Sequence, residues 1–118
     1  MMDLIDEKIQ YDHIKWQQVQ DKLYKRFGRI PDLQTITYLI GHRELGQNRI
    51  EFTKEEKEEL MHVGVCTLLA QRDMYRFDYL DQDGWPHYQK NPNVPHFDGK
   101  EQEDLLKAMI IEYFERMQ

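Results

Sequence analysis

The most apolar stretch of the chain lies at its centre, in residues 60–70. Only His62 and Thr67 are polar there, so at helical pitch no face is left for water. A helix that is apolar on all sides is a buried one. Gly64 and Cys66 are small and allow neighbouring elements to approach closely. The pattern predicts a buried central helix around which the other elements pack.

Capping signals mark the start of this helix and of the last one. Thr53 and Glu56 have the spacing of a capping box, and so do Asp98 and Glu101. We expect the central helix to run from Thr53 to about Arg72. The final helix is expected after Asp98, with an apolar stripe at helical spacing. That stripe consists of Leu105, Leu106, Met109, Ile110, Tyr113, Phe114 and Met117.

Apolar residues near the N-terminus predict a long amphipathic helix over residues 3–27, ending at Gly28. Asp12 takes the one missing place in its stripe. This carboxylate is either buried with a partner or, at the edge of the stripe, solvated or paired with a lysine. The stripe consists of Ile5, Ile9, Trp16, Val19, Leu23 and Phe27.

A second helix is expected to begin with Pro31 and Asp32 in its first turn and to end at about Leu45, before Gly46. Proline suits the first helical position, and an acid suits the positive end of the helix dipole. Residues 35–38 are rich in β-branched side chains, so a strand is the alternative there.

Aromatic residues alternate with charged ones across residues 75–79, and Asp83 and Gly84 follow as a turn pair. This pattern predicts a β-hairpin from Tyr75 to about Gln89. Pro86 must then lie where no ladder hydrogen bond is required of its nitrogen. In the alternative, the central helix continues to Leu80.

Two prolines within residues 91–97 predict a connecting loop before the last helix. The expected fold is mainly α, with four helices and one β-hairpin inserted between the third and fourth. At 118 residues the chain is about one domain long. We expect a single helical domain over residues 1–118.

Composition and charge argue against a disordered, membrane-spanning or nucleic-acid-binding protein. An aromatic content of 12% argues against disorder, and no apolar run reaches the ~20 residues of a membrane span. We do not expect the acidic N-terminal residues 1–7 to be a secretory signal. A net charge of -6 argues against nucleic acid as a partner. The basic patch of Lys22, Lys25, Arg26 and Arg29 is interpreted as a helix end that complements the dipole. The lone Cys66 suits the reducing cytoplasm.

Three segments resemble an uncharacterised family of small, mainly helical bacterial proteins with no known activity. They are residues 59–69 (ELMHVGVCTLL), 80–88 (LDQDGWPHY) and 112–115 (EYFE). The resemblance covers roughly the last two thirds of the chain. It implies a bacterial, cytoplasmic setting and assigns no catalytic or binding residue.

Glu59 and His62 form the one pattern typical of metal chemistry. A Glu-x-x-His pair on a helix supplies half of the ligand set of dinuclear carboxylate bundles. No other histidine has a glutamate three residues before it. We therefore expect no cofactor or metal, and a small metal-dependent enzyme using Glu59, His62 and His42 is an alternative. Phosphate-binding loops, nucleophile elbows and Cys-x-x-Cys pairs are absent from the sequence.

An aromatic cluster in the hairpin and the following loop is the candidate contact surface, because aromatic anchors dominate many interfaces. These rings would otherwise cover the ends of the helices. The leading hypothesis is a non-catalytic cytoplasmic protein that binds another protein or itself, as in a homodimer. The second alternative is a winged-helix-like nucleic-acid binder. The predicted contact residues are Trp85, His87, Tyr88, His96 and Phe97.

Overall fold

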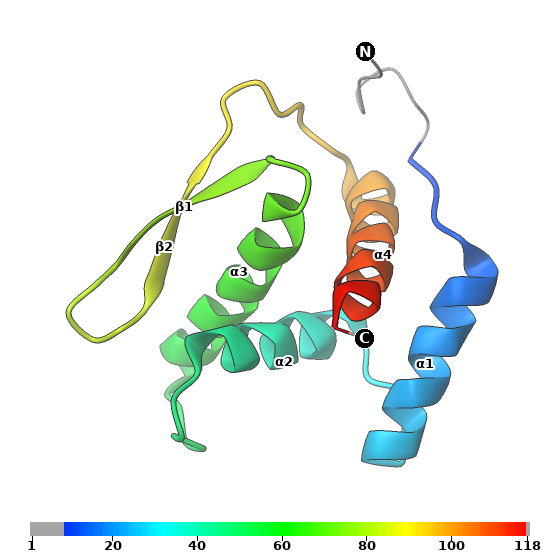
Figure 1. The fold of residues 1–118 in the computed structure, drawn as a ribbon, viewed down its shortest axis with the longest axis horizontal. Coiled ribbons are helices and arrows are strands. Elements are labelled where there is room, and N and C mark those ends of the chain that lie inside the picture. The colour runs from blue at the N-terminus through cyan, green and yellow to red at the C-terminus, as the bar shows by residue number, and fades with distance from the viewer. Residues whose placement is uncertain (1–8, 118) are drawn as a thin grey trace. The chain divides into compact units, whose positions relative to one another are not determined.

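The computed structural model describes residues 9–117, which form four α-helices and one antiparallel β-hairpin (Figure 1). This confirms the predicted fold class, with the hairpin between the third and fourth helices. Contacts group the elements into two compact units, residues 1–31 with 93–118, and residues 32–92. The elements are α1 His13–Phe27, α2 Leu33–Leu45, α3 Lys54–Ala70, β1 Tyr75–Leu80, β2 Pro86–Lys90 and α4 Gly99–Arg116.

The first unit contains α1 and α4, which lie side by side (Figure 1). Lys15 of α1 forms an ion pair of 2.9 Å with Glu115 of α4. The ammonium group of Lys107 lies over the rings of Tyr11 and Trp16, at 5.0 and 5.8 Å from their centroids. Both helices carry a stripe of buried apolar side chains. These are Trp16, Val19 and Leu23 of α1 and Leu105, Leu106, Met109, Ile110, Ile111 and Tyr113 of α4.

The start of α1 corrects the sequence prediction. The helix begins at His13, and Asp12 is its N-cap rather than a member of the stripe. The Asp12 carboxylate accepts hydrogen bonds from the backbone N–H groups of Ile14 and Lys15, at 2.9 and 3.0 Å. Such a bond satisfies donors that the first turn leaves unpaired, which fixes the helix start. Ile9 lies outside the helix, and Ile5 lies outside the described residues.

The second unit is built on close contact between α2 and α3. A Cβ atom on Gly64 would collide with the backbone carbonyl of Thr37, and one on Gly41 with the backbone carbonyl of Leu60. The two helices therefore meet backbone to backbone. Beside this contact, the side chains of Leu45, Leu60, Val63 and Trp85 form a buried cluster, against which Tyr38 and Phe52 pack.

Most predicted helix ends agree with the structure. Thr53 caps α3 and Asp98 caps α4, each with the complete capping box. Gly28 and Gly46 end α1 and α2 with φ angles of 76° and 70°, which glycine adopts without strain.

The start of the second helix differs from the prediction, and two alternatives are excluded. Asp32 is the N-cap of α2, so Pro31 precedes the helix instead of opening it. Residues 35–38 are helical, which excludes the strand alternative, and α3 ends at Ala70, which excludes its continuation to Leu80. Among residues 9–117, no helix has both the length and the apolar character needed to cross a bilayer.

Candidate functional site

The base of the hairpin is fixed to the end of α3. The chain leaves the helix through a turn in which Asp73 adopts a positive φ of 59°. The amide of Met74 then donates to the carbonyl of Leu69 at 3.1 Å, and the Met74 side chain is buried. Asn91, at the end of the second strand, donates to the carbonyls of Met74 and Asp73 at 2.9 and 3.1 Å. Both ends of the hairpin are therefore held against one helix end.

The tip of the hairpin is organised by the Asp81 carboxylate. It accepts hydrogen bonds from the backbone N–H groups of Asp83 and Trp85, at 2.9 and 3.0 Å. Its other oxygen lies 2.9 Å from Nε2 of His87. Outside the hairpin, the side-chain amide of Gln47 donates to the carbonyl of Asp83 at 2.8 Å. These bonds hold the turn in one conformation.

One face of the hairpin packs on α3 and the helix–loop region before it. The Trp85 ring meets that of Phe52 edge-on, with centroids 6.4 Å apart. Tyr88 places its hydroxyl 3.3 Å from Oγ1 of Thr67 on α3. Burial raises the pKa of the Tyr88 hydroxyl, so it stays protonated near neutral pH. Trp85 and Tyr88 thus attach the hairpin to its own unit.

A bulge in β1 separates the aromatic residues of that strand onto two faces. Phe77 is opposite Tyr88 and Tyr79 is opposite His87, so Asp78 is the extra residue. Successive strand residues point to opposite faces, so His87 and Tyr88 lie on different faces. Phe77 therefore shares the face of Tyr88, whereas Tyr79 stacks on His87 on the outer face, with centroids 4.6 Å apart and planes at 3°.

Four of the exposed side chains of the hairpin are aromatic or aliphatic; they lie on both of its faces, among exposed charged residues such as Arg76 and Asp78, and we call these four the hairpin surface. It consists of Phe77, Tyr79, Leu80 and His87. The first three are 53%, 51% and 61% exposed, although they are large and apolar. Sequence reasoning placed Phe77, Tyr79 and Leu80 in the hairpin without assigning them to a contact site. Alternation alone does not tell which strand positions a neighbouring helix leaves uncovered.

The five predicted contact residues occupy different environments. Trp85 is only 7% exposed, because it packs in the core of the second unit, so we do not include it in the hairpin surface. Tyr88 is half-buried, and His87 is exposed. His96 is exposed and Phe97 half-buried in the loop before α4, which belongs to the first unit.

The candidate metal ligands Glu59 and His62 are both exposed on α3. Nε2 of His62 lies 3.4 Å from Sγ of Cys66, one turn further along the helix. Burial raises the pKa of the Cys66 thiol to about 12, so it is not a thiolate near neutral pH. His42 contacts the carbonyl of Arg49 at 3.0 Å. Within residues 9–117, no three His, Cys, Asp or Glu side chains converge as a metal site would require.

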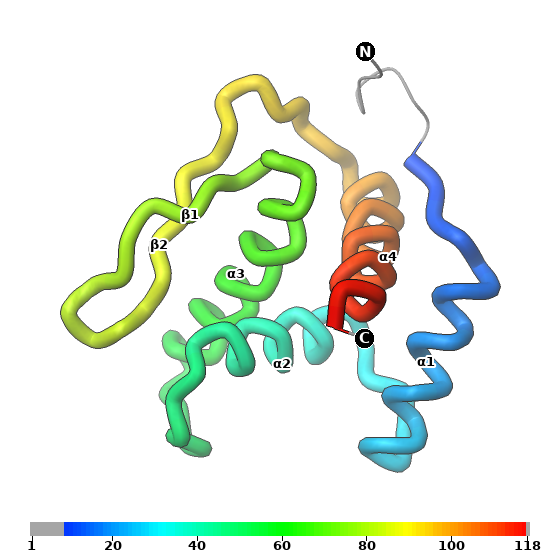
Figure 2. The backbone as a smooth tube through the Cα atoms, in the orientation of Figure 1, coloured from blue at the N-terminus to red at the C-terminus, as the bar shows by residue number. Residues whose placement is uncertain are grey.

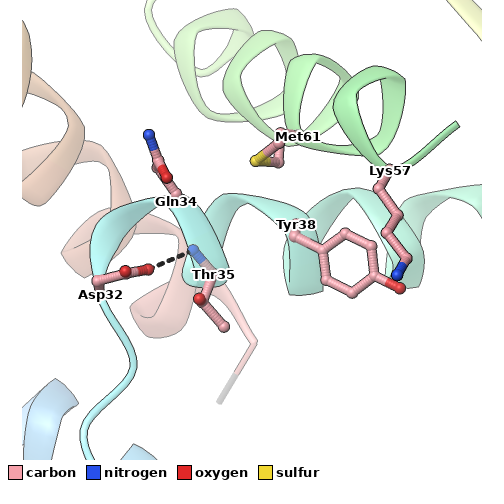
Figure 3. Close-up of a pocket in the computed structure, with 6 residues that line it drawn as sticks. All are labelled: Asp32, Gln34, Thr35, Tyr38, Lys57 and Met61. Carbon is pink, nitrogen blue, oxygen red and sulfur yellow. Dashed lines mark hydrogen bonds between the residues drawn. The ribbon is translucent and has the colours of Figure 1, made fainter. Parts of the chain in front are cut away.

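An open pocket of about 310 Å³ lies between the first half of α2 and α3 (Figure 3). The Asp32 carboxylate at its edge is already used in capping, since it accepts from the amide of Thr35 at 2.8 Å. Lys57 and Tyr38 extend along its opposite side (Figure 3). The charged groups at the pocket are therefore the ammonium group of Lys57 and the carboxylate of Asp32, which already accepts a hydrogen bond from the backbone. It is lined by Asp32, Gln34, Thr35, Tyr38, Lys57 and Met61.

Acidification is expected to loosen the hairpin tip. The hydrogen bond from His87, and then those from the backbone of Trp85 and Asp83, hold the pKa of Asp81 below its ordinary value of 3.8. A carboxyl with a lowered folded-state pKa stabilises the fold above its unfolded pKa, and this stabilisation is lost as pH falls through the folded pKa. We expect the amide resonance of Trp85 to shift below about pH 3.8 in an NMR titration.

The matched control for this titration is Asp81→Asn, which retains an acceptor oxygen but cannot titrate. The acid shift of the Trp85 amide should then disappear. An unchanged shift in the Asp81→Asn variant would show that another group controls the tip.

Comparison of the chain with protein-family models, with curated proteins and with solved structures found no significant match.

Proposed function

We propose that this chain is a protein–protein interaction module whose contact site is the hairpin surface. The observation that carries the proposal is the exposure of Phe77, Tyr79 and Leu80, each more than half exposed on one short strand. Large aromatic and aliphatic side chains lose unfavourable contact with water when a partner covers them. Contact sites of this kind rely on a few such anchors.

The rigidity of the hairpin supports a binding role. An isolated two-stranded hairpin is marginal in water, yet this one is held by Trp85 in the core and by the Tyr88–Thr67 contact. The Tyr79–His87 stack and the Asp81–His87 hydrogen bond also restrain the exposed rings. Side chains ordered before binding lose less conformational entropy on association.

The charge on α3 favours this proposal over the winged-helix alternative. A recognition helix before the hairpin would present lysines and arginines to phosphate groups. The exposed positions of α3 instead carry three glutamates against two lysines and one histidine. They are Lys54, Glu55, Lys57, Glu58, Glu59 and His62. We place the module in the cytoplasm, because its buried, free Cys66 suits a reducing compartment.

Photo-crosslinking in the native host tests the proposal. A photoreactive phenylalanine analogue at Tyr79, on the outer face of the hairpin, is expected to give a discrete adduct with one protein. Tyr24 is the matched control, because it is a tyrosine of similar exposure, 55% against 51%, on α1. The adduct at residue 24 should be absent.

The protein found in the adduct is then purified, and its affinity for variants of the hairpin surface is measured. Phe77→Ser and Leu80→Ser should each weaken binding about tenfold, the loss expected for an interface anchor. The proposed contact site would be contradicted if no adduct formed at residue 79, or if residues 24 and 79 gave the same adduct.

A further inference from the structure

The outer edge of β1 is open for strand pairing. The sheet contains only β1 and β2 within residues 9–117, so no described strand pairs with that edge. Figure 2 shows the hairpin extending away from the end of α3 toward its tip, with the two strands crossing in this view. The contacts of Tyr88 with Thr67 and of Tyr75 with His62 show that a face of the hairpin packs on α3. An open edge presents backbone donors and acceptors to a further strand.

The ladder pattern shows which residue of β1 offers its backbone at this edge. The amide of Asn91 donates to the carbonyl of Met74 at 2.9 Å, so these two residues form a hydrogen-bonded pair. Hydrogen-bonded and non-hydrogen-bonded pairs alternate along an antiparallel ladder. Phe77, three residues after Met74 and opposite Tyr88, therefore belongs to a non-hydrogen-bonded pair. Its N–H and C=O point away from β2, toward the open edge.

The residues on both sides of Phe77 carry opposite charges. Arg76 is opposite Gln89, and the Gln89 amide donates to Asp78 at 3.0 Å, so Arg76 and Asp78 share the outer face. In an antiparallel pair of two β1 strands centred on Phe77, Arg76 of each copy faces Asp78 of the other. Opposite charges directly across two strands stabilise their pairing. This short segment is thus complementary to itself.

We infer that the partner of the hairpin surface is a second copy of this chain, joined through antiparallel pairing of the two β1 strands about Phe77. This inference rests on the proposed function, because it uses the same hairpin. The dimer has a two-fold axis and a four-stranded sheet in the order β2, β1, β1 and β2. Pairing satisfies the backbone of Phe77 and covers part of its exposed ring.

Charge reversal tests the inference on the full chain. Sedimentation equilibrium over a concentration series should show a wild-type monomer–dimer equilibrium. Arg76→Asp and Asp78→Arg should each weaken dimerisation about tenfold, because two attractive pairs become repulsive. An equimolar mixture of the two variants should form a mixed dimer of about wild-type affinity, since its charges are complementary again. The double variant Arg76→Asp/Asp78→Arg should also dimerise like wild type.

Lys90→Glu is the control, because it reverses an exposed charge on β2, away from the paired edge. It should dimerise like wild type, and far-UV circular dichroism should show that all variants are folded. A monomeric wild type, or a mixture no more dimeric than its components, would overturn the inference. A monomeric wild type with a foreign protein in the Tyr79 adduct leaves the proposed function standing, whereas a monomer with no adduct overturns both.

Discussion

Gly64→Ala is expected to lower the free energy of unfolding by about 3 kcal/mol, at the upper end of what overpacking of a core costs. The new Cβ would occupy the space of the Thr37 carbonyl on α2. Because the obstacle is backbone, no side-chain rotation relieves the collision, and α2 and α3 must separate. The change is measured as a lower midpoint of chemical denaturation at an unchanged slope.

The control for this variant is Gly99→Ala, in the first turn of α4. No atom lies near the position of its Cβ, and its φ is ordinary for an L-residue. Alanine is the better helix former, so its stability should equal or slightly exceed that of wild type. A Gly64→Ala variant as stable as Gly99→Ala would mean that the close contact of α2 and α3 is absent in solution.

The predicted helices show which parts of the fold local chemistry decides. Thr53 and Asp98 were identified as helix starts because a capping box involves only neighbouring residues. Asp12 was misplaced because a gap in an apolar stripe and a helix start look alike in a periodic pattern. The hydrogen bonds that the Asp12 carboxylate accepts from the amides of Ile14 and Lys15 show that it is the helix start. These bonds depend on a backbone conformation that the apolar pattern does not encode.

The candidate site was only partly predictable, because its outer face is decided by tertiary contacts. The Asp83–Gly84 pair and the aromatic alternation located the hairpin. The bulge at Asp78, which moves Tyr79 onto the face opposite Phe77, has no signature in the alternation itself. Which face is covered follows from the contact of Tyr88 with Thr67, residues that are distant in sequence.

Trp85→Ala is expected to cost about 3–5 kcal/mol of folding free energy, the range for removing a large aromatic side chain from a core. Trp85 is 7% exposed and packs with Leu60, Val63 and Phe52, so its loss leaves a cavity beside α3. The residue type did not reveal this role, because aromatic side chains serve cores and contact surfaces alike.

Stability of the Trp85→Ala variant is measured by far-UV circular dichroism, since the substitution removes one of the two tryptophans that fluorescence would report. Tyr79→Ala, on the same hairpin but 51% exposed, is the control and should cost less than about 1 kcal/mol, as is usual for a surface side chain. The two variants separate the two roles of the hairpin: Trp85 anchors it to α3, and Tyr79 is available to a partner. A Trp85→Ala chain that keeps wild-type stability but loses dimerisation would return Trp85 to the contact surface that its residue type suggested.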